Sequence, residues 1–322
     1  MNKVYSMLGR LCLLAVFGLQ AGCITVNLIE PAGPVHEVQL SGTGDGKVLL
    51  LDLTGIISSQ DKEGIIPQPN MVAMFKEELT RASKDDKIKA VVVRINSPGG
   101  TVTASDILYH ELREFKTKRK VPVIASMMDV AASGGYYLAM AADSVLVHPS
   151  TVTGSIGVIM LTVNARGLLE KVGLEANAIT SGPRKDMGSP FRVMTPEERG
   201  VFQSVIDAFY YRFLAVVQEG RPNLTSDQIK KLADGRIYSG DQAKAAGLID
   251  EIGYIDDALE MAKKKAGLTE ARIVTYGRRG EYQNNIYSRL FGTSAGFTGL
   301  ANLDLLSMVR GGTPQFMYLW MP

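Results

Sequence analysis

The 322-residue chain is 46% hydrophobic and 21% charged, which allows a buried core and excludes a wholly disordered protein. Its net charge of +2 comes from Lys3 and Arg10 in the first 22 residues, so the body is neutral, which argues against a nucleic-acid partner. We expect no disulfide, zinc site, iron–sulfur cluster or nucleophilic thiol in the body, because the cysteines and histidines of the chain are Cys12, Cys23, His36, His110 and His148.

The N-terminus predicts export. Two basic residues precede the apolar run Leu11 to Leu19, and Ala21 and Gly22 follow it. This pattern is typical of a secretory signal peptide over residues 1–22 and is too short for a membrane span of about 20 residues. The next residue, Cys23, resembles the lipidated cysteine of a bacterial lipoprotein, although Gln20 departs from that pattern. A plain signal peptide and an uncleaved anchor are the alternatives.

All three interpretations place the body outside the cytoplasm, anchored to the periplasmic side of a bacterial membrane in the lipoprotein case. Residues 23–46 contain two prolines and four glycines and predict a tether. We expect the folded domain at 47–278 and a C-terminal tail without a clear period at 279–322.

The body alternates apolar strands with helices, which predicts an α/β fold with a mostly parallel sheet covered on both faces and a C-terminal helical extension. Strands are expected at 47–57, 88–95, 122–127, 144–147, 175–180 and 272–276. Helices are expected at 70–83, 104–118, 196–220, 226–234, 240–247 and 255–265.

A turn between a strand and a helix carries Ser133, followed by Gly134 and Gly135. A serine hydroxyl there lies near free backbone N–H groups, as a nucleophile requires when its carbonyl target becomes an oxyanion. The alternative is that Ser133 only caps its helix, because serine is a leading N-cap residue.

Two further glycine-bearing turns follow strands. The turn 97–100 has glycine amides that could donate hydrogen bonds to an oxyanion; the alternative is an ordinary loop between a strand and a helix. A phosphate-binding role is not indicated, because the common phosphate-binding motifs are absent there. The turn 153–157 contains Ser155, either a second hydroxyl facing the site or part of a tight turn.

A nucleophilic serine needs a base. His36 lies in the expected tether and His110 on a charged helix, which leaves His148 at a strand end as the histidine candidate. Lysine is the other option, and Lys185 stands in an unusual loop between a strand and a helix. The alternative, when Lys185 is considered without the other motifs, is that it is an ordinary solvated loop residue.

Four segments together resemble the signal peptide peptidase A family of the Clp protease/crotonase superfamily. They are INSPGGTVTASD (95–106), VAASGGYYLAMAAD (130–143), TVTGSIGVI (151–159) and SGPRKDMGSPFRVMTPEER (181–199). The resemblance covers about 47–265 and matches the short branch with a single repeat.

The resemblance implies a serine endopeptidase with a Ser–Lys dyad that cleaves hydrophobic peptides such as released signal peptides. Ser133 would be the nucleophile, Lys185 the general base and Ser155 the residue that positions the lysine. Gly100 and Gly134 would form the oxyanion hole, and no metal or other cofactor would be needed. The lysine must lose its proton at neutral pH, so its pKa would have to fall from about 10.4 through desolvation.

The same resemblance implies a homo-oligomeric ring in which serine and lysine come from neighbouring copies. The lipoprotein-like N-terminus departs from the family, whose members carry a membrane-spanning helix. Two alternatives stay open: a catalytically silent peptide-binding scaffold, and a crotonase-like acyl-CoA enzyme.

The end of the chain, 316–320, is an apolar run with the single tryptophan of the sequence. An extended apolar peptide adds readily to a sheet edge. We expect it to dock near the substrate groove or, as the alternative, at an interface between copies.

Overall fold

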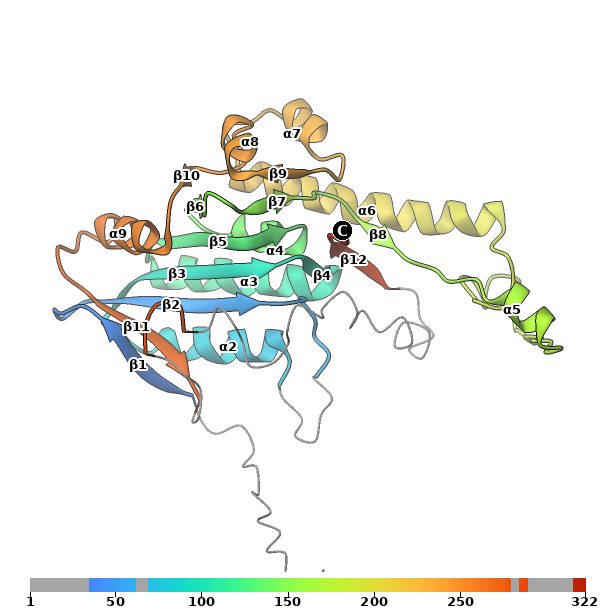
Figure 1. The fold of residues 1–322 in the computed structure, drawn as a ribbon, viewed down its shortest axis with the longest axis horizontal. Coiled ribbons are helices and arrows are strands. Elements are labelled where there is room, and N and C mark those ends of the chain that lie inside the picture. The colour runs from blue at the N-terminus through green and yellow to red at the C-terminus, as the bar shows by residue number, and fades with distance from the viewer. Residues whose placement is uncertain (1–34, 62–68, 279–283, 289–314) are drawn as a thin grey trace, which may run out of the picture. The chain divides into compact units, whose positions relative to one another are not determined.

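The structure is a computed structural model that describes residues 35–61, 69–278, 284–288 and 315–322 (Figure 1). The expected signal peptide at 1–22 and Cys23 lie outside the described residues, as do the tether up to residue 34 and most of the C-terminal tail.

The described residues alternate strands and helices, as the sequence predicted. The strands are β1 (His36–Ser41), β2 (Lys47–Thr54), β3 (Ile88–Ser97), β4 (Gly99–Thr101), β5 (Val123–Ala132), β6 (Ser144–Val147), β7 (Val152–Gly154), β8 (Ile159–Met160), β9 (Ile237–Ser239), β10 (Glu251–Ile252), β11 (Arg272–Gly277) and β12 (Phe316–Leu319). The helices are α2 (Met71–Ala82), α3 (Val102–Arg119), α4 (Gly134–Ala139), α5 (Arg166–Lys171), α6 (Pro196–Gly220), α7 (Ser226–Leu232), α8 (Gly240–Ala245) and α9 (Ile255–Lys265).

The main sheet has the strand order β1-β11-β2-β3-β5-β6-β10, and β7 pairs with β5 and β9. Neighbouring strands from β11 to β10 are parallel, and so are β5 and β7, whereas β1 and β9 pair antiparallel with their neighbours. The fold is therefore α/β with a mostly parallel sheet, as predicted. A second, antiparallel sheet has the order β4-β12-β8.

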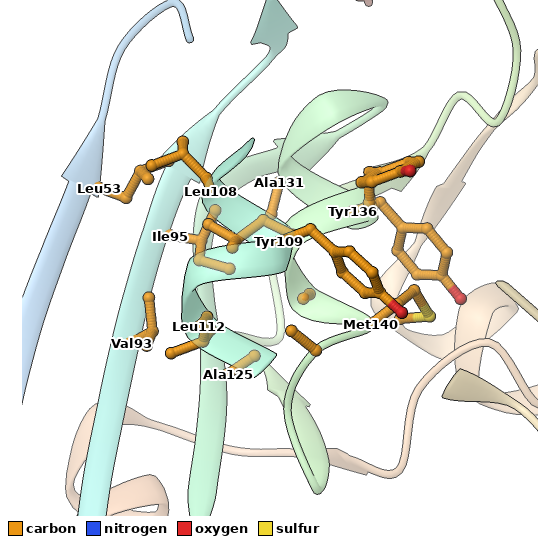
Figure 2. Close-up of a cluster of buried hydrophobic side chains, with 14 of the residues drawn as sticks. Leu53, Val93, Ile95, Leu108, Tyr109, Leu112, Ala125, Ala131, Tyr136 and Met140 are labelled. Atoms are coloured by element: carbon orange, nitrogen blue, oxygen red, sulfur yellow. The ribbon is translucent and has the colours of Figure 1, made fainter. Parts of the chain in front are cut away.

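Both faces of the main sheet are buried, which explains the unbroken apolar runs of its central strands. Alternate residues of β2 divide between the faces: Leu49, Leu51 and Leu53 join the core shared with α2, α3 and α4, while Val48 and Leu50 pack with α9. Figure 2 shows the first of these cores, with side chains of β3 and β5 against those of α3 and α4.

The start of α6 was also predictable. Thr195 accepts a hydrogen bond from the Glu198 amide, and the Glu198 side chain accepts one from the Thr195 amide, which makes a capping box ahead of Pro196. Among the described residues, α6 is the one helix long and apolar enough to span a membrane by length and composition.

Three expectations fail. The tether prediction is wrong at His36–Ser41, which forms β1 on the sheet edge beside β11. Residues 175–180 form no strand, and Ile179 is fully exposed, because no neighbouring strand pairs with this segment. The region after α6 contains the predicted strand at 272–276, which is β11, but it also supplies the short strands β9 and β10, which were not expected.

Candidate active site

Neighbouring parallel strands end together and bring the three glycine-bearing turns to one edge of the sheet. Ser97 on β3 pairs with Ala131 on β5, and Ala132 on β5 pairs with Gly154 on β7. The residues that follow these pairs are therefore neighbours although they are far apart in the sequence. Ligand sites of open α/β sheets form at such carboxyl ends.

Ser133, the predicted nucleophile, occupies the turn between β5 and α4. Its backbone has φ 52° and ψ −113°, a left-handed conformation that residues with a Cβ rarely adopt. The Ser133 amide donates to the Gly154 carbonyl at 2.7 Å, which fixes the turn. The side chain is buried and makes no capping hydrogen bond, so the interpretation of Ser133 as a helix cap is wrong.

Gly99, Gly100 and Gly134 pack against one another beside Ser133. A methyl group added to Gly134 would lie 3.1 Å from Gly99 Cα and 3.2 Å from Gly100 N. Strand β4 is held from the other side by Ile57, whose amide donates to the Gly99 carbonyl and whose carbonyl accepts from the Thr101 amide. The two predicted oxyanion amides are therefore brought together on a fixed backbone, as an oxyanion hole requires.

Ser155 follows the strand next to that of Ser133 and shares its backbone strain, with φ 49°. Its amide donates to the Arg236 carbonyl at 2.8 Å. Ser155 lines a pocket of about 240 Å³ together with Gly157, Val158, Ile159, Gly235, Leu319, Trp320 and Met321. Ser155 therefore borders a space close to the turn of Ser133, which the interpretation as a mere turn residue does not require.

Lys185 is not brought to Ser133 within one chain. It lies in the segment 161–195 between β8 and α6, which includes α5 and extends away from the main sheet (Figure 1). The side chain is exposed, and within the described residues its ammonium group has no hydrogen-bond or ion-pair partner. Within the part of the chain that the structure describes, no hydrogen bond joins Lys185 to Ser133.

The loop that carries Lys185 is nevertheless fixed. Arg192 forms ion pairs with Asp186, the neighbour of Lys185, and with Glu198 on α6. The guanidinium group lowers the pKa of both carboxyls, so both pairs are present at neutral pH. The Asp186 carboxylate is thereby engaged by Arg192.

Comparisons with known proteins identify the family of the chain. The profile of peptidase family S49 matches residues 115–269, and that of Clp protease matches 66–152. A protein of Enterococcus faecium, provisionally named signal peptide peptidase SppA, is 37% identical over 75% of this chain and 70% of its own length. The chain belongs to peptidase family S49. It is therefore a serine peptidase.

Two longer relatives contain the same region. Protease 4 of Salmonella typhi is 36% identical over 62% of this chain and 32% of its own length. Serine protease SPPA, chloroplastic, of Arabidopsis thaliana is 33% identical over 73% of this chain and 35% of its own length.

The remaining histidine candidate of this S49 peptidase is engaged elsewhere. His148 Nδ1 forms a hydrogen bond with the Ser150 hydroxyl at 2.8 Å, and its ring packs edge-on against Tyr254. Within the described residues no hydrogen bond joins His148 to Ser133.

Two features of the S49 peptidase site were missed in the sequence. Gly99 has φ 101°, so glycine is needed there, and Tyr318 of β12 pairs with Gly100. The Ser-Pro-Gly-Gly sequence of this turn was a signal that glycine is needed at position 99. Nothing local predicts which residue of the tail lies opposite Gly100, because the two are more than 200 residues apart.

Proposed function

We propose that this protein is a membrane-associated serine endopeptidase that cleaves hydrophobic peptides, such as released signal peptides, with Ser133 and Lys185 as a dyad. The observation that carries the proposal is the turn at Ser133: a buried serine with a strained backbone and no capping bond, packed beside the amides of Gly100 and Gly134. That arrangement suits attack on a carbonyl whose oxygen becomes an anion.

In the proposed reaction, neutral Lys185 takes the proton of the Ser133 hydroxyl as the oxygen attacks the peptide carbonyl. The Gly100 and Gly134 amides donate to the oxyanion, and Lys185 then gives the proton to the leaving amine. Water deprotonated by the same lysine hydrolyses the acyl-enzyme and frees Ser133. Ser155 orients the lysine from its place beside the catalytic turn.

We place Lys185 in the site of a neighbouring copy. Support comes from the course of the segment 161–195, which extends away from the main sheet in Figure 1, and from the apolar surface of this segment, which is unusual on a monomer. Eight large apolar side chains there are exposed: Leu161, Val163, Leu168, Val172, Leu174, Ile179, Phe191 and Val193. A homo-oligomeric ring would cover them and complete each dyad.

A serine-reactive fluorophosphonate probe tests the chemistry. Wild-type protein should become labelled, whereas Ser133→Ala and Lys185→Ala should not. Labelling of Ser133→Ala at the wild-type rate would show that another residue is the nucleophile.

Mixing the two inactive variants tests where the lysine comes from. Subunits of Ser133→Ala still supply Lys185, and subunits of Lys185→Ala still supply Ser133. If assembly is random, equal amounts should restore about a quarter of the wild-type sites after the subunits exchange. No recovery after exchange, with oligomers intact, would show that serine and lysine act within one chain.

A further inference from the structure

Strand β5 has a bulge just before the nucleophile. Ile95 on β3 pairs with Met127 on β5. The next pair is Ser97 with Ala131, so one residue of β3 lies opposite three residues of β5. A bulge bends its strand and changes the direction of the residues that follow it, and bulges are over-represented next to active sites. Ser133 is the second residue after this pair, so its position depends on how the bulge is held.

Asn96 is the residue of β3 that lies opposite the bulge, and its side chain holds the bulge at two points. The Asn96 Oδ1 atom accepts a hydrogen bond from the Val130 amide at 3.1 Å, and the Nδ2 atom donates to the Asp129 carboxylate at 3.0 Å. A backbone N–H within a sheet needs an acceptor, and the bulge leaves the Val130 amide to a side chain. An amide side chain supplies both the acceptor and the donor that this double contact needs.

Two buried threonines hold the same stretch of β5 from its other edge. The Thr151 hydroxyl donates to the Met128 carbonyl at 2.6 Å, and the Thr153 hydroxyl donates to the Ala131 carbonyl at 2.7 Å. Both threonine side chains are excluded from solvent, so these hydrogen bonds do not compete with water. The bulge is therefore held from both sides, and Asn96 provides side-chain contacts on the side of β3.

Asn96 also belongs to the segment that carries the predicted oxyanion amide of Gly100. It lies four residues before Gly100, and its backbone carbonyl accepts a hydrogen bond from the Gly55 amide at 2.9 Å. Its side-chain partner Val130 lies three residues before Ser133. β3 and β5 run side by side toward β4 and α4 (Figure 1). Asn96 therefore joins the strand that leads to the oxyanion hole to the strand that leads to the nucleophile.

We propose that Asn96 is a positioning residue, whose side chain fixes the bulge of β5 and thereby sets the place of Ser133 relative to the Gly100 amide. This rests on the proposed function and adds a residue to it. Asn96 acts through the backbone of β5 and not on the substrate. The nucleophile and the oxyanion donors must both lie about 3 Å from the same carbonyl group, and a displacement of about 1 Å can slow a reaction roughly 100-fold.

The first test is Asn96→Ala in the full-length oligomer, with a hydrophobic peptide as substrate and the fluorophosphonate probe to count reactive sites. We expect kcat per reactive site to fall roughly 10- to 100-fold while KM changes less than about threefold, because the reacting groups are displaced and the peptide-binding surface is kept. A merely structural role would lower the unfolding temperature and leave kcat per reactive site at the wild-type value. That result would overturn the proposal.

An exchange of side chains tests the contact itself and does not depend on Asn96→Ala being folded. Asn96→Asp keeps the shape and the acceptor for the Val130 amide but sets a second carboxylate against Asp129. It should lower kcat roughly 3- to 10-fold, because a hydrogen bond becomes a repulsion between like charges. Adding Asp129→Asn restores one donor and one acceptor with their roles exchanged, and kcat should return to at least about half of the wild-type value. A folded double variant that stays as slow as Asn96→Asp would contradict the proposed role.

Asn223→Asp is the matched control, because it makes the same chemical change at an exposed position between α6 and α7 and should leave kcat unchanged. The wild-type protein separates the two levels of failure. If it reacts with the probe and cleaves the peptide, and Asn96→Ala has the same kcat per site, the positioning role alone fails. If the wild type neither reacts nor cleaves, the proposed function fails and the positioning role fails with it.

Discussion

Ser133 combines a reactive position with an unfavourable backbone. A residue with a Cβ at φ 52° and ψ −113° stores about 1–3 kcal/mol, which the packing of the turn must offset. We therefore predict that Ser133→Gly is more stable than Ser133→Ala by about 1 kcal/mol, because glycine relieves the strain that alanine keeps. Denaturant unfolding of the two inactive variants measures the difference. The usual order, with alanine the more stable, would show that the turn is not strained.

Lys185 has little to do with folding, because its side chain is exposed. Lys185→Ala and Lys185→Arg should both lose peptide hydrolysis while keeping the wild-type unfolding curve and oligomer size. Arginine keeps the positive charge but stays protonated and is no base. An arginine variant with near-wild-type turnover contradicts the base assignment.

Ser155 is predicted to assist. Ser155→Ala keeps the Cβ and hence the backbone strain at φ 49°, so it removes only the hydroxyl. Loss of one net hydrogen bond should slow probe labelling roughly 2- to 12-fold without abolishing it. Labelling of Ser155→Ala at the wild-type rate would show that Ser155 is only a turn residue.

At the scale of elements, local patterns predicted what depends on local physics. The apolar run of β3 and the capping box of α6 are readable from a few neighbouring residues. His36–Ser41 was missed because its partner β11 lies more than 200 residues later, and prolines and glycines around it favoured a loop. The segment 175–180 failed for the converse reason, since a strand needs a neighbour as well as a pattern.

The candidate site also has features that local sequence predicts and features that depend on residues far apart in the chain. The glycine turns and Ser133 were found because each turn has its own sequence signature. The pairing of Tyr318 with Gly100 depends on the course of the whole chain, so the tail was expected near the groove without a register.

The position of β12 leads to a prediction about the tail. Deleting residues 315–322 should raise peptide hydrolysis, because β12 occupies the edge of β4 where a substrate strand would pair. Deleting only Pro322, which is exposed and lies beyond β12, should leave the rate unchanged. Steady-state rates and oligomer size distinguish a plug of the substrate groove from a contact between copies. Loss of the oligomer, or no change in rate, in the longer deletion contradicts a role as a plug and favours an interface between copies.

At the scale of the whole molecule, membrane attachment should decide which peptides the enzyme meets. Short apolar fragments collect at a membrane, and an enzyme held there encounters them at higher local concentration. We propose that the attachment is at Cys23, which directly follows Ala21 and Gly22. Lipidation would leave the peptidase domain outside the cytoplasm, which fits a role in clearing released signal peptides.

Cys23→Ser should therefore release the protein from the membrane fraction or leave its precursor unprocessed, because serine offers no thiol for a lipid. Cys12→Ser is the matched control: it changes the other cysteine of the chain, within the apolar run of the signal, and should leave attachment intact. Metabolic labelling with a fatty acid, followed by fractionation, measures both variants. Labelled fatty acid in Cys23→Ser would show that the lipid is attached to another residue. A wild-type protein that is processed but carries no labelled fatty acid would show that the N-terminus is a plain cleaved signal peptide.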